Sequence, residues 1–282
     1  MVTNERPRSQ DGFAQRLRHS AHRRESWLCV GLDPDPNRLP QNLPQNARGI
    51  ADFCRAIIDS TQNVAAAYKL NLAFFELLGA EGWSALEEVH NAVPADTPVI
   101  ADAKRGDIGN TSRAYADSIL GNLKFDALTV SPYLGWDALQ PFLEYQLKGV
   151  IVLCKTSNPG ASALQDLEVG GEPLYMRVAR GALSLPSAAD VGLVVGATQP
   201  EALRAVRRLN TDTILLVPGV GEQGGSAAQA VELGANAQGD NALINVSREI
   251  LFASDGADYA ARAARVARER ASETWRGGAR TG

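Results

Sequence analysis

The chain has 282 residues, of which 45% are hydrophobic and 21% are charged, and its formal net charge is −4 at pH 7. This composition is typical of a globular protein with a large core, and the length suits a single α/β barrel. The negative net charge argues against nucleic acid or an anionic membrane surface as a partner.

The first residues carry no apolar stretch of the kind found in signal peptides, and no run approaches the ~20 apolar residues of a membrane span. The three cysteines, Cys29, Cys54 and Cys154, form no C-x-x-C pair. We therefore expect buried thiols rather than disulfides, as in a cytoplasmic protein. None of the three histidines lies at the end of an expected strand, so the chain either does its chemistry with other side chains or does none.

The elements begin with a basic helix at about 11–24, which we expect to cap one end of the fold. From Trp27 onwards, short apolar runs alternate with amphipathic stretches. The expected strands are rich in β-branched residues and bounded by Gly, Pro, Asp or Asn; they are Leu28–Leu32, Ala66–Leu70, Val99–Ala103, Ala127–Val130, Val150–Cys154, Val191–Val195, Thr213–Val217 and Ala242–Val246. The clearest helical patterns are Ala51–Asn63, Phe74–Asn91, Ser112–Gly121, Trp136–Leu147, Pro200–Leu209 and about Asp258–Thr274.

Eight strands that alternate with helices predict a parallel sheet, and the number eight favours a closed (β/α)8 TIM barrel. An open doubly wound sheet is the alternative. No linker divides the chain, so residues 1–282 are expected to form one domain with a mobile tail at about 275–282. Asp33–Asn46 and Thr156–Pro173 are expected to be long loops after the first and fifth strands, where a barrel places its active site.

The strongest chemical signal lies in the segment Val99–Thr111, which reads VIADAKRGDIGNT. Residues two apart in a strand face the same side, so Asp102 and Lys104 share a face at the end of the third strand. Asp107 follows beyond a glycine. Such charges are costly to desolvate unless they pair. The spacing alone fits either a catalytic cluster or an ion pair that closes the barrel end.

A further cation, Lys69, falls near the end of the second strand within an apolar run. Neighbouring strands of a barrel bring it within reach of Asp102 and Lys104. Burial alone would remove its proton, whereas nearby carboxylates would keep it charged. The alternative is a lysine whose ammonium group reaches solvent at the rim.

A third signal indicates a phosphate site. The glycine-rich segment Val217–Gly225 follows the seventh strand, and Arg248 follows the eighth. Barrels often bind phosphate with these two loops, through backbone N–H groups and a cation. Asp33 ends the first strand and Ser157 follows the fifth; each is either a site residue or an ordinary polar loop residue.

Together these segments resemble the orotidine 5′-phosphate decarboxylase family, in its longer bacterial branch. The resemblance runs from about Ser26 to Phe252 and is carried, in chain order, by GLDP, KLNLAFFE, DAKRGDIGNT, TSNPG and PGVGEQGG. It implies decarboxylation of orotidine 5′-phosphate to UMP and CO2, the last step of de novo pyrimidine nucleotide synthesis. It implies no metal and no cofactor, and the sequence shows no sign of a site for pyridoxal phosphate or thiamine.

The resemblance also implies the roles of the charged residues. Lys69, Asp102 and Lys104 would form a charged network in one subunit, with Lys104 protonating C6 of the pyrimidine. Asp107 would complete the site of the partner in a homodimer. The aspartates would hold both lysines protonated and in place.

The remaining implied contacts are to the nucleotide. Asp33 and Lys69 would hold ribose hydroxyls, and Thr111 would cross the dimer interface with Asp107 to touch the ribose. Ser157 would contact the ring, and Ile108 would provide an apolar wall. The phosphate would be bound by Gln223 and Arg248.

Three other readings remain open from the sequence. A Mg²⁺-dependent sugar-phosphate decarboxylase shares the Asp-x-Lys-x-x-Asp motif but has an acidic residue where Lys69 stands. A Schiff-base aldolase would need Lys69 or Lys104 with a depressed pKa, which flanking carboxylates oppose. A barrel that only binds nucleotide phosphates would bind UMP without turnover.

Overall fold

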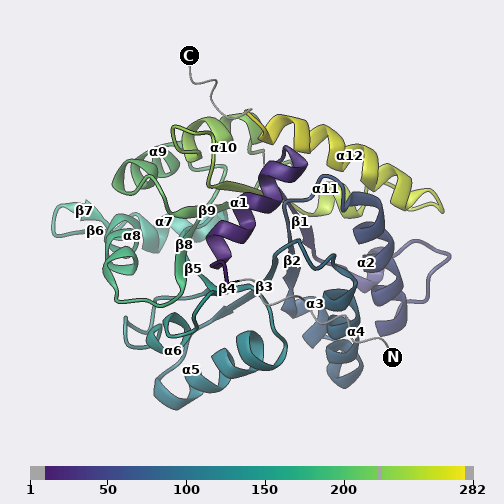
Figure 1. The fold of residues 1–282 in the computed structure, drawn as a ribbon, viewed down its shortest axis with the longest axis horizontal. Coiled ribbons are helices and arrows are strands. Elements are labelled where there is room, and N and C mark those ends of the chain that lie inside the picture. The colour runs from purple at the N-terminus through teal and green to yellow at the C-terminus, as the bar shows by residue number, and fades with distance from the viewer. Residues whose placement is uncertain (1–9, 222–223, 277–282) are drawn as a thin grey trace.

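The computed structural model describes residues 10–221 and 224–276, and within them eight parallel strands close into a barrel surrounded by helices (Figure 1). The strands follow one another around the barrel in the order β1-β10-β9-β8-β5-β4-β3-β2. Their bounds are β1 Leu28–Leu32, β2 Ala67–Asn71, β3 Val99–Arg105, β4 Ala127–Val130, β5 Gly149–Lys155, β8 Asp190–Val195, β9 Ile214–Val217 and β10 Ala242–Val246. The predicted closed barrel is confirmed, and the open doubly wound alternative is wrong.

The strand predictions are close because each strand is buried on both faces and reads as a short apolar run. Three strands have the predicted bounds, and four differ by one residue at one or both ends. The larger difference is in β3, which continues to Arg105 instead of ending at Ala103. The two added residues include Lys104, so the strand carries this lysine to the barrel mouth.

The helices that cover the barrel are less regular than the sequence pattern predicts. Their bounds are α1 Phe13–Arg24, α2 Ala47–Thr61, α3 Leu72–Glu76, α4 Gly79–Ala92, α5 Gly109–Ala116, α6 Gln140–Leu143, α7 Ser162–Gln165, α8 Leu174–Ser184, α9 Pro200–Leu209, α10 Ala227–Gly234, α11 Arg248–Leu251 and α12 Tyr259–Thr274. The helix predicted over Phe74–Asn91 is two helices, because the chain turns at Gly79, where φ is +62°.

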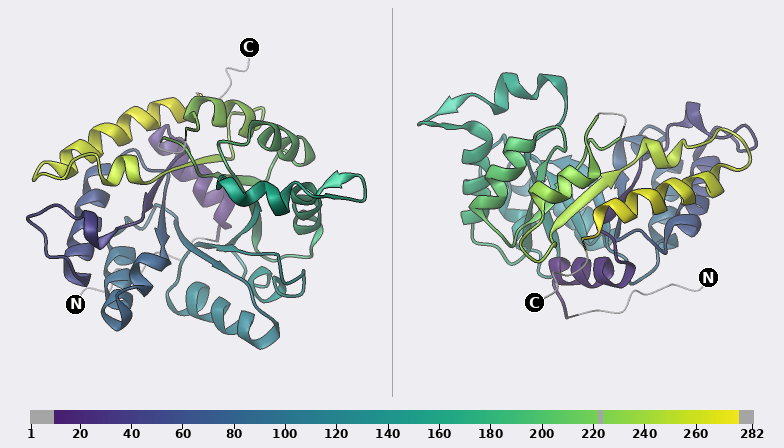
Figure 2. Two further views of the ribbon diagram at one scale, coloured as in Figure 1. Left: turned by 180° about the vertical axis from the view of Figure 1, so that it is seen from behind. Right: turned by 90° about the horizontal axis from the view of Figure 1, so that it is seen from above.

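The segment predicted as a loop over Thr156–Pro173 has structure of its own. It contains α7 and a short antiparallel hairpin, β6 (Glu168–Val169) and β7 (Glu172–Pro173). Gly170 and Gly171 connect the two strands with positive φ angles, which glycine adopts without strain. This hairpin projects from the end of the molecule opposite α1 (Figure 2).

Helix α1 closes the end of the barrel at which the strands begin. Phe13, Leu17 and Ala21 are buried in one cluster with interior barrel residues such as Ile100 and Ile151. The approach is so close that a Cβ at Gly149, the first residue of β5, would lie 2.4 Å from the Phe13 ring. The helix therefore forms the floor of the barrel.

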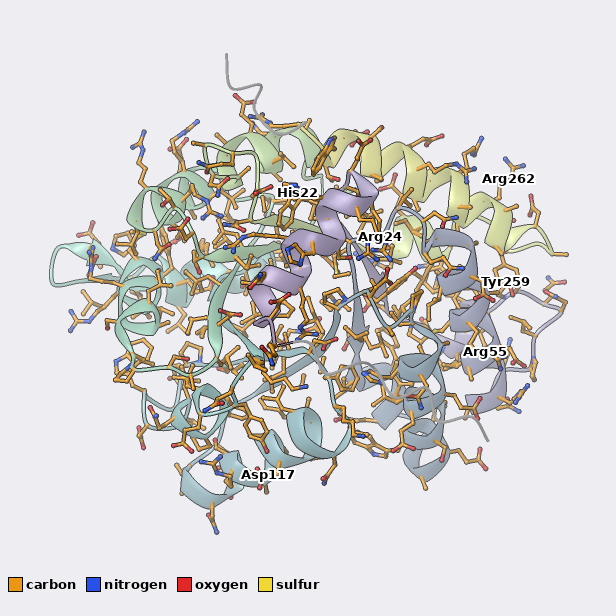
Figure 3. The ribbon with its side chains drawn as sticks, in the orientation of Figure 1. His22, Arg24, Arg55, Asp117, Tyr259 and Arg262 are labelled. Atoms are coloured by element: carbon orange, nitrogen blue, oxygen red, sulfur yellow. The ribbon has the colours of Figure 1, made fainter. Side chains whose placement is uncertain are left out.

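Polar contacts fix α1 across several strands. The carboxylate of Asp190, the first residue of β8, accepts a hydrogen bond from Ala14 N at 2.8 Å, and Arg16 pairs with Asp126 at 2.5 Å. Arg24, labelled with His22 on α1 in Figure 3, donates to the carbonyl of Gln62 at 2.9 Å. The His22 ring meets Trp275 edge to face, with centroids 5.3 Å apart. Of the tail predicted at about 275–282, residues 277–282 lie outside the described residues.

No helix in the described ranges is long and apolar enough to cross a membrane. The three cysteines are buried and free.

Replacement of Leu17 by alanine should destabilise the protein by ~2–5 kcal/mol, because this fully buried side chain fills the floor of the barrel. Urea unfolding at one fixed protein concentration measures the difference. His19→Ala, at an exposed position of the same helix, should change the free energy of unfolding by less than about 0.5 kcal/mol. Equal free energies of unfolding for the two variants would show that the packing of α1 against the barrel does not stabilise the fold.

Candidate active site

A cavity of ≈ 600 Å³ opens at the end of the barrel where the strands finish. Its walls come from the ends of barrel strands and from the loops that follow them. The lining includes Asp33, Lys69, Asp102, Lys104, Thr129, Ser157, Gly219 and Arg248. Six of the ten residues predicted for the site, from five different strand ends, therefore meet in one cavity.

The second and third strands bring Lys69 and Asp102 together. Asn71 in β2 is the register partner of Asp102 in β3, so Lys69 lies two residues earlier on the neighbouring strand. Its Nζ donates to Asp102 Oδ2 at 2.8 Å and lies 3.7 Å from Asp33 Oδ1. The Lys69 side chain is only 5% exposed, so the alternative of an ammonium group in solvent at the rim is wrong.

Lys104 completes a row of three charges. Its Nζ donates to Asp102 Oδ1 at 2.7 Å, so the two lysines bind the two oxygens of one carboxylate. Both lysines line the cavity, but the Lys104 side chain is 52% exposed, whereas that of Lys69 is only 5% exposed. The backbone of Lys104 has φ +47°, a left-handed conformation that costs roughly 1–2 kcal/mol in a residue other than glycine.

The row of charges is electrostatically self-consistent. Burial opposes charge on Lys69, but the carboxylates of Asp102 and Asp33 outweigh it and raise the pKa of Lys69 above its usual value. Burial also opposes charge on Asp102, yet Lys69 and Lys104 hold the pKa of that carboxyl well below its usual range. Lys69 and Asp102 are therefore both ionised at neutral pH.

Asp33 connects this row to the other side of the cavity. Its Oδ2 accepts a hydrogen bond from Ser247 Oγ at 2.5 Å, while its Oδ1 faces Lys69. Ser247 follows β10 and directly precedes Arg248, which begins α11. The carboxylate of Asp33 thus spans from the buried lysine to the loop that carries the predicted phosphate-binding arginine.

The glycine-rich loop after β9 folds back on itself beside that arginine. Gly219 and Gly221 have positive φ angles, and Gly225 N donates to Gly219 O at 3.1 Å. Gly221 has φ +82°, which strains any other residue, and a Cβ there would lie 2.3 Å from a carboxylate oxygen of Glu249, which would have to move. Of the two predicted phosphate ligands, Arg248 lines the cavity, and Gln223 lies outside the described residues.

Three predicted residues lie away from the cavity lining of this single chain. Asp107 is half-buried, and its Oδ1 accepts from the backbone N–H of Ile108 at 2.7 Å. Ile108 is 64% exposed, and Thr111 is also exposed, in the first turn of α5. The fold of one chain does not bring these three side chains to Lys69 and Asp102.

Sequence reasoning missed two polar side chains that shape the site. Thr129 in β4 is buried in the cavity wall and donates to Asp102 Oδ1 at 3.0 Å. Lys155, at the end of β5, is buried and pairs with Asp166 at 2.6 Å, which ties down the loop that carries Ser157. The signal was available: each is a polar residue within or directly after an apolar strand pattern.

The described residues contain no cluster of three or more His, Cys, Asp or Glu side chains arranged to hold a metal ion. The carboxylates of Asp33 and Asp102 in the cavity instead face lysines of the chain itself. The arrangement can hold an anionic ligand near the glycine-rich loop and present an ammonium group, Lys104, to its other end.

Asp102→Asn should lower the free energy of unfolding at pH 7 by about 3 kcal/mol or more, because Lys69 stays buried without its main partner. The Asp102 pKa is lower in the folded chain than in the unfolded one. The stabilisation is therefore fully present above the ordinary pKa of aspartate and is lost as pH falls toward the depressed value.

The difference between wild type and Asp102→Asn in urea unfolding should consequently narrow from pH 7 to about pH 3. Asp52→Asn, which breaks a surface pair with Arg48, should cost less than about 1 kcal/mol at either pH. A gap that does not depend on pH would contradict the ionised state of Asp102.

Comparison with known proteins identifies the family of this chain. Residues 26–263 match the orotidine 5′-phosphate decarboxylase / HUMPS family. The orotidine 5′-phosphate decarboxylase of Roseiflexus castenholzii is 50% identical over 259 residues, which are 91% of this chain and 95% of the relative. The structure of Leishmania donovani OMP decarboxylase has a TM-score of 0.81 and 44% identity, and covers 94% of this chain and 100% of that one.

A second solved structure, that of Leishmania donovani UMP synthase, is 46% identical with a TM-score of 0.83. The match covers 96% of this chain, which spans only 58% of that longer protein. Family match, sequence identity and fold thus agree over nearly the whole length. The chain belongs to the orotidine 5′-phosphate decarboxylase / HUMPS family.

Proposed function

We propose that this protein decarboxylates orotidine 5′-phosphate to UMP and CO2, the last step of de novo pyrimidine nucleotide synthesis, without a metal or other cofactor. The observation that carries the proposal is the row Lys69–Asp102–Lys104 at the mouth of the barrel, in a chain of this family. We also propose that it works in the cytoplasm, where its buried cysteines remain thiols.

The chemistry follows from where charge develops. Loss of CO2 from C6 leaves a carbanion with little delocalisation, so fixed charges must stabilise it. In this proposal the half-exposed ammonium group of Lys104 faces C6, stabilises the carbanion and then donates the proton that completes UMP. Asp102 keeps Lys104 charged and oriented, and Lys69 holds Asp102 from the other side.

The remainder of the nucleotide would provide binding energy away from the reacting carbon. We propose that Arg248 and Gln223 bind the phosphate, that Asp33 and Lys69 bind ribose hydroxyls, and that Ser157 contacts the ring. The position of Arg248 in the cavity lining, next to the glycine-rich loop, supports the first of these roles. Each tenfold of rate needs about 1.4 kcal/mol of selective stabilisation, and phosphate binding can contribute by driving loop closure.

We further propose that the active form is a homodimer in which Asp107 and Thr111 reach the partner's cavity and Ile108 gives its ring an apolar wall. The loop after β4 also carries two exposed apolar side chains, Tyr133 and Leu134, which are 78% and 52% exposed, and Ile108 lies in the loop after β3. The two loops are joined by the hydrogen bond from Ser131 N to Arg105 O. Such an apolar surface is typical of a subunit interface.

Two alternative activities fit the charges less well. A Mg²⁺ site at Asp33 and Asp102 would face repulsion from the Lys69 ammonium group, which lies 3.7 and 2.8 Å from them. A Schiff-base lysine needs a depressed pKa, whereas the carboxylates raise the pKa of Lys69. Absence of an adduct on borohydride trapping with a carbonyl substrate would dismiss the aldolase.

The deciding experiment follows the ultraviolet absorbance of orotidine 5′-phosphate with purified protein in excess EDTA. Wild type should convert it rapidly to UMP. Lys104→Ala should lose turnover by ~10³-fold or more while still binding UMP in calorimetry, because the phosphate and ribose contacts remain.

Lys124→Ala, at an exposed lysine outside the cavity, is the matched control and should retain full activity. UMP binding without turnover by wild type would favour a binding-only barrel. Near-normal turnover by Lys104→Ala would remove Lys104 from the mechanism.

Mixing the inactive variants Lys104→Ala and Asp107→Ala should restore activity, because one site of each heterodimer then has both residues. With random exchange of subunits about a quarter of the wild-type activity is the upper limit. Mixing Lys104→Ala with Asp102→Ala is the control and should restore none, since both residues belong to the same chain's site. If exchanged subunits of the first pair stay inactive, the shared site is refuted.

A further inference from the structure

Thr129 makes an unusual set of contacts for a residue in the middle of a barrel strand. It is 1% exposed, in β4, and its hydroxyl oxygen accepts hydrogen bonds from Ala103 N and Lys104 N, both at 3.0 Å. The same hydroxyl donates to Asp102 Oδ1 at 3.0 Å. A threonine hydroxyl has one proton and two lone pairs, so all of its hydrogen-bonding capacity is used here.

These contacts arise from an irregularity in the pairing of β3 with β4. Ala101 pairs with Leu128 and Arg105 pairs with Val130, so Asp102, Ala103 and Lys104 together lie opposite Thr129. A bulge of this kind removes backbone N–H groups from the ladder and redirects side chains. The Thr129 hydroxyl replaces the missing acceptors for two of these N–H groups.

The bulge is also where the backbone of Lys104 takes its left-handed conformation, with φ +47°. Asp102 Oδ1, which accepts the hydrogen bond from Thr129, is the same oxygen that accepts from Lys104 Nζ at 2.7 Å. Thr129 therefore holds Lys104 at both ends. It binds the backbone N–H of that lysine and the carboxylate oxygen to which the ammonium group is bound.

We infer that Thr129 is a positioning residue for Lys104, which fixes the bulge and the Asp102 carboxylate so that the ammonium group faces the reacting carbon. The inference rests on the proposed function for the role of Lys104 but on the hydrogen bonds alone for the geometry. It predicts that the hydroxyl, and not the methyl group, of Thr129 matters for the chemical step.

Thr129→Val keeps the shape of the side chain but removes the hydroxyl, and Thr129→Ala removes both. Both variants should lose kcat by ~10²-fold, as expected when one preorganised hydrogen-bonding group of a site is removed. Their affinity for UMP should stay within about threefold of wild type, because the phosphate and ribose contacts are elsewhere. Thr129→Ser, which keeps the hydroxyl, should recover most of kcat.

The matched control is Thr213→Val. Thr213 is a buried threonine just before β9, and its hydroxyl donates to Val191 O at 2.8 Å at the opposite end of the barrel. This variant should lose stability but keep kcat. Equal losses of kcat in Thr129→Val and Thr213→Val would indicate a general loss of structure and overturn the inference, as would kcat within about threefold of wild type in Thr129→Val.

Amide hydrogen exchange of the segment 99–106 separates this inference from the proposed function. Exchange should be faster in Thr129→Val than in wild type and close to wild type in Thr129→Ser, because Ala103 N and Lys104 N lose their acceptor only in the former. If wild type does not decarboxylate orotidine 5′-phosphate, the proposed function fails, and this measurement still decides the geometry. Unchanged exchange in Thr129→Val would refute the role of Thr129.

Discussion

The carboxylate of Asp102 lies between the ammonium groups of Lys69 and Lys104 and forms an ion pair with each. The other features of the cavity depend on these two ion pairs. A buried lysine without a partner would release its proton, and a buried carboxylate without a partner would take one up. Neither happens here, because each charge lies within hydrogen-bonding distance of the opposite one. The remaining excess of positive charge is on Lys104, at the exposed end of the row, where it can stabilise a developing negative charge on a ligand.

The barrel provides the rigidity that this arrangement needs. Parallel strands fix Lys69 and Asp102 on neighbouring backbones, and α1 fills the opposite end of the barrel with apolar side chains. The charged cavity at the other end is therefore lined by strand ends and loops that are anchored to a packed interior. Large local charges are tolerated at this end since each is paired and the nearby backbone N–H groups find acceptors.

The side of the cavity that is proposed to bind phosphate is held by a second set of contacts. Glu249, next to Arg248, pairs with Arg270 of α12 at 2.5 Å and contacts Gly221 of the glycine-rich loop. Ser247 connects the same short segment to Asp33. The loops after β1, β9 and β10 are therefore linked to one another. A ligand bound to Arg248 would be connected, through the adjacent Ser247, to the Asp33 carboxylate that faces Lys69. In the proposed function, this linkage connects the phosphate contact of Arg248 to the row Lys69–Asp102–Lys104.

The sequence by itself determined the alternation of strands and helices, the number of barrel strands and the ends of strands that carry Lys69, Asp102 and Lys104. Those are consequences of local pattern, because a buried strand is a short apolar run and its last residues face the same end of the barrel. The break at Gly79 and the hairpin β6–β7 escaped the pattern, since both depend on single backbone angles rather than on periodicity.

Only the tertiary structure decided how the charged residues meet. The strand alternation places Asp102 and Lys104 on one face, but the bulge opposite Thr129 and the left-handed backbone of Lys104 set where the ammonium group lies. The pairing register between separate strands is a non-local property. The sequence of β3 therefore does not indicate that Thr129 in β4 supports the bulge. The positions of Asp107, Ile108 and Thr111 outside the cavity likewise follow from the folded chain, because a sequence motif gives their order and not the direction in which α5 leads away from β3.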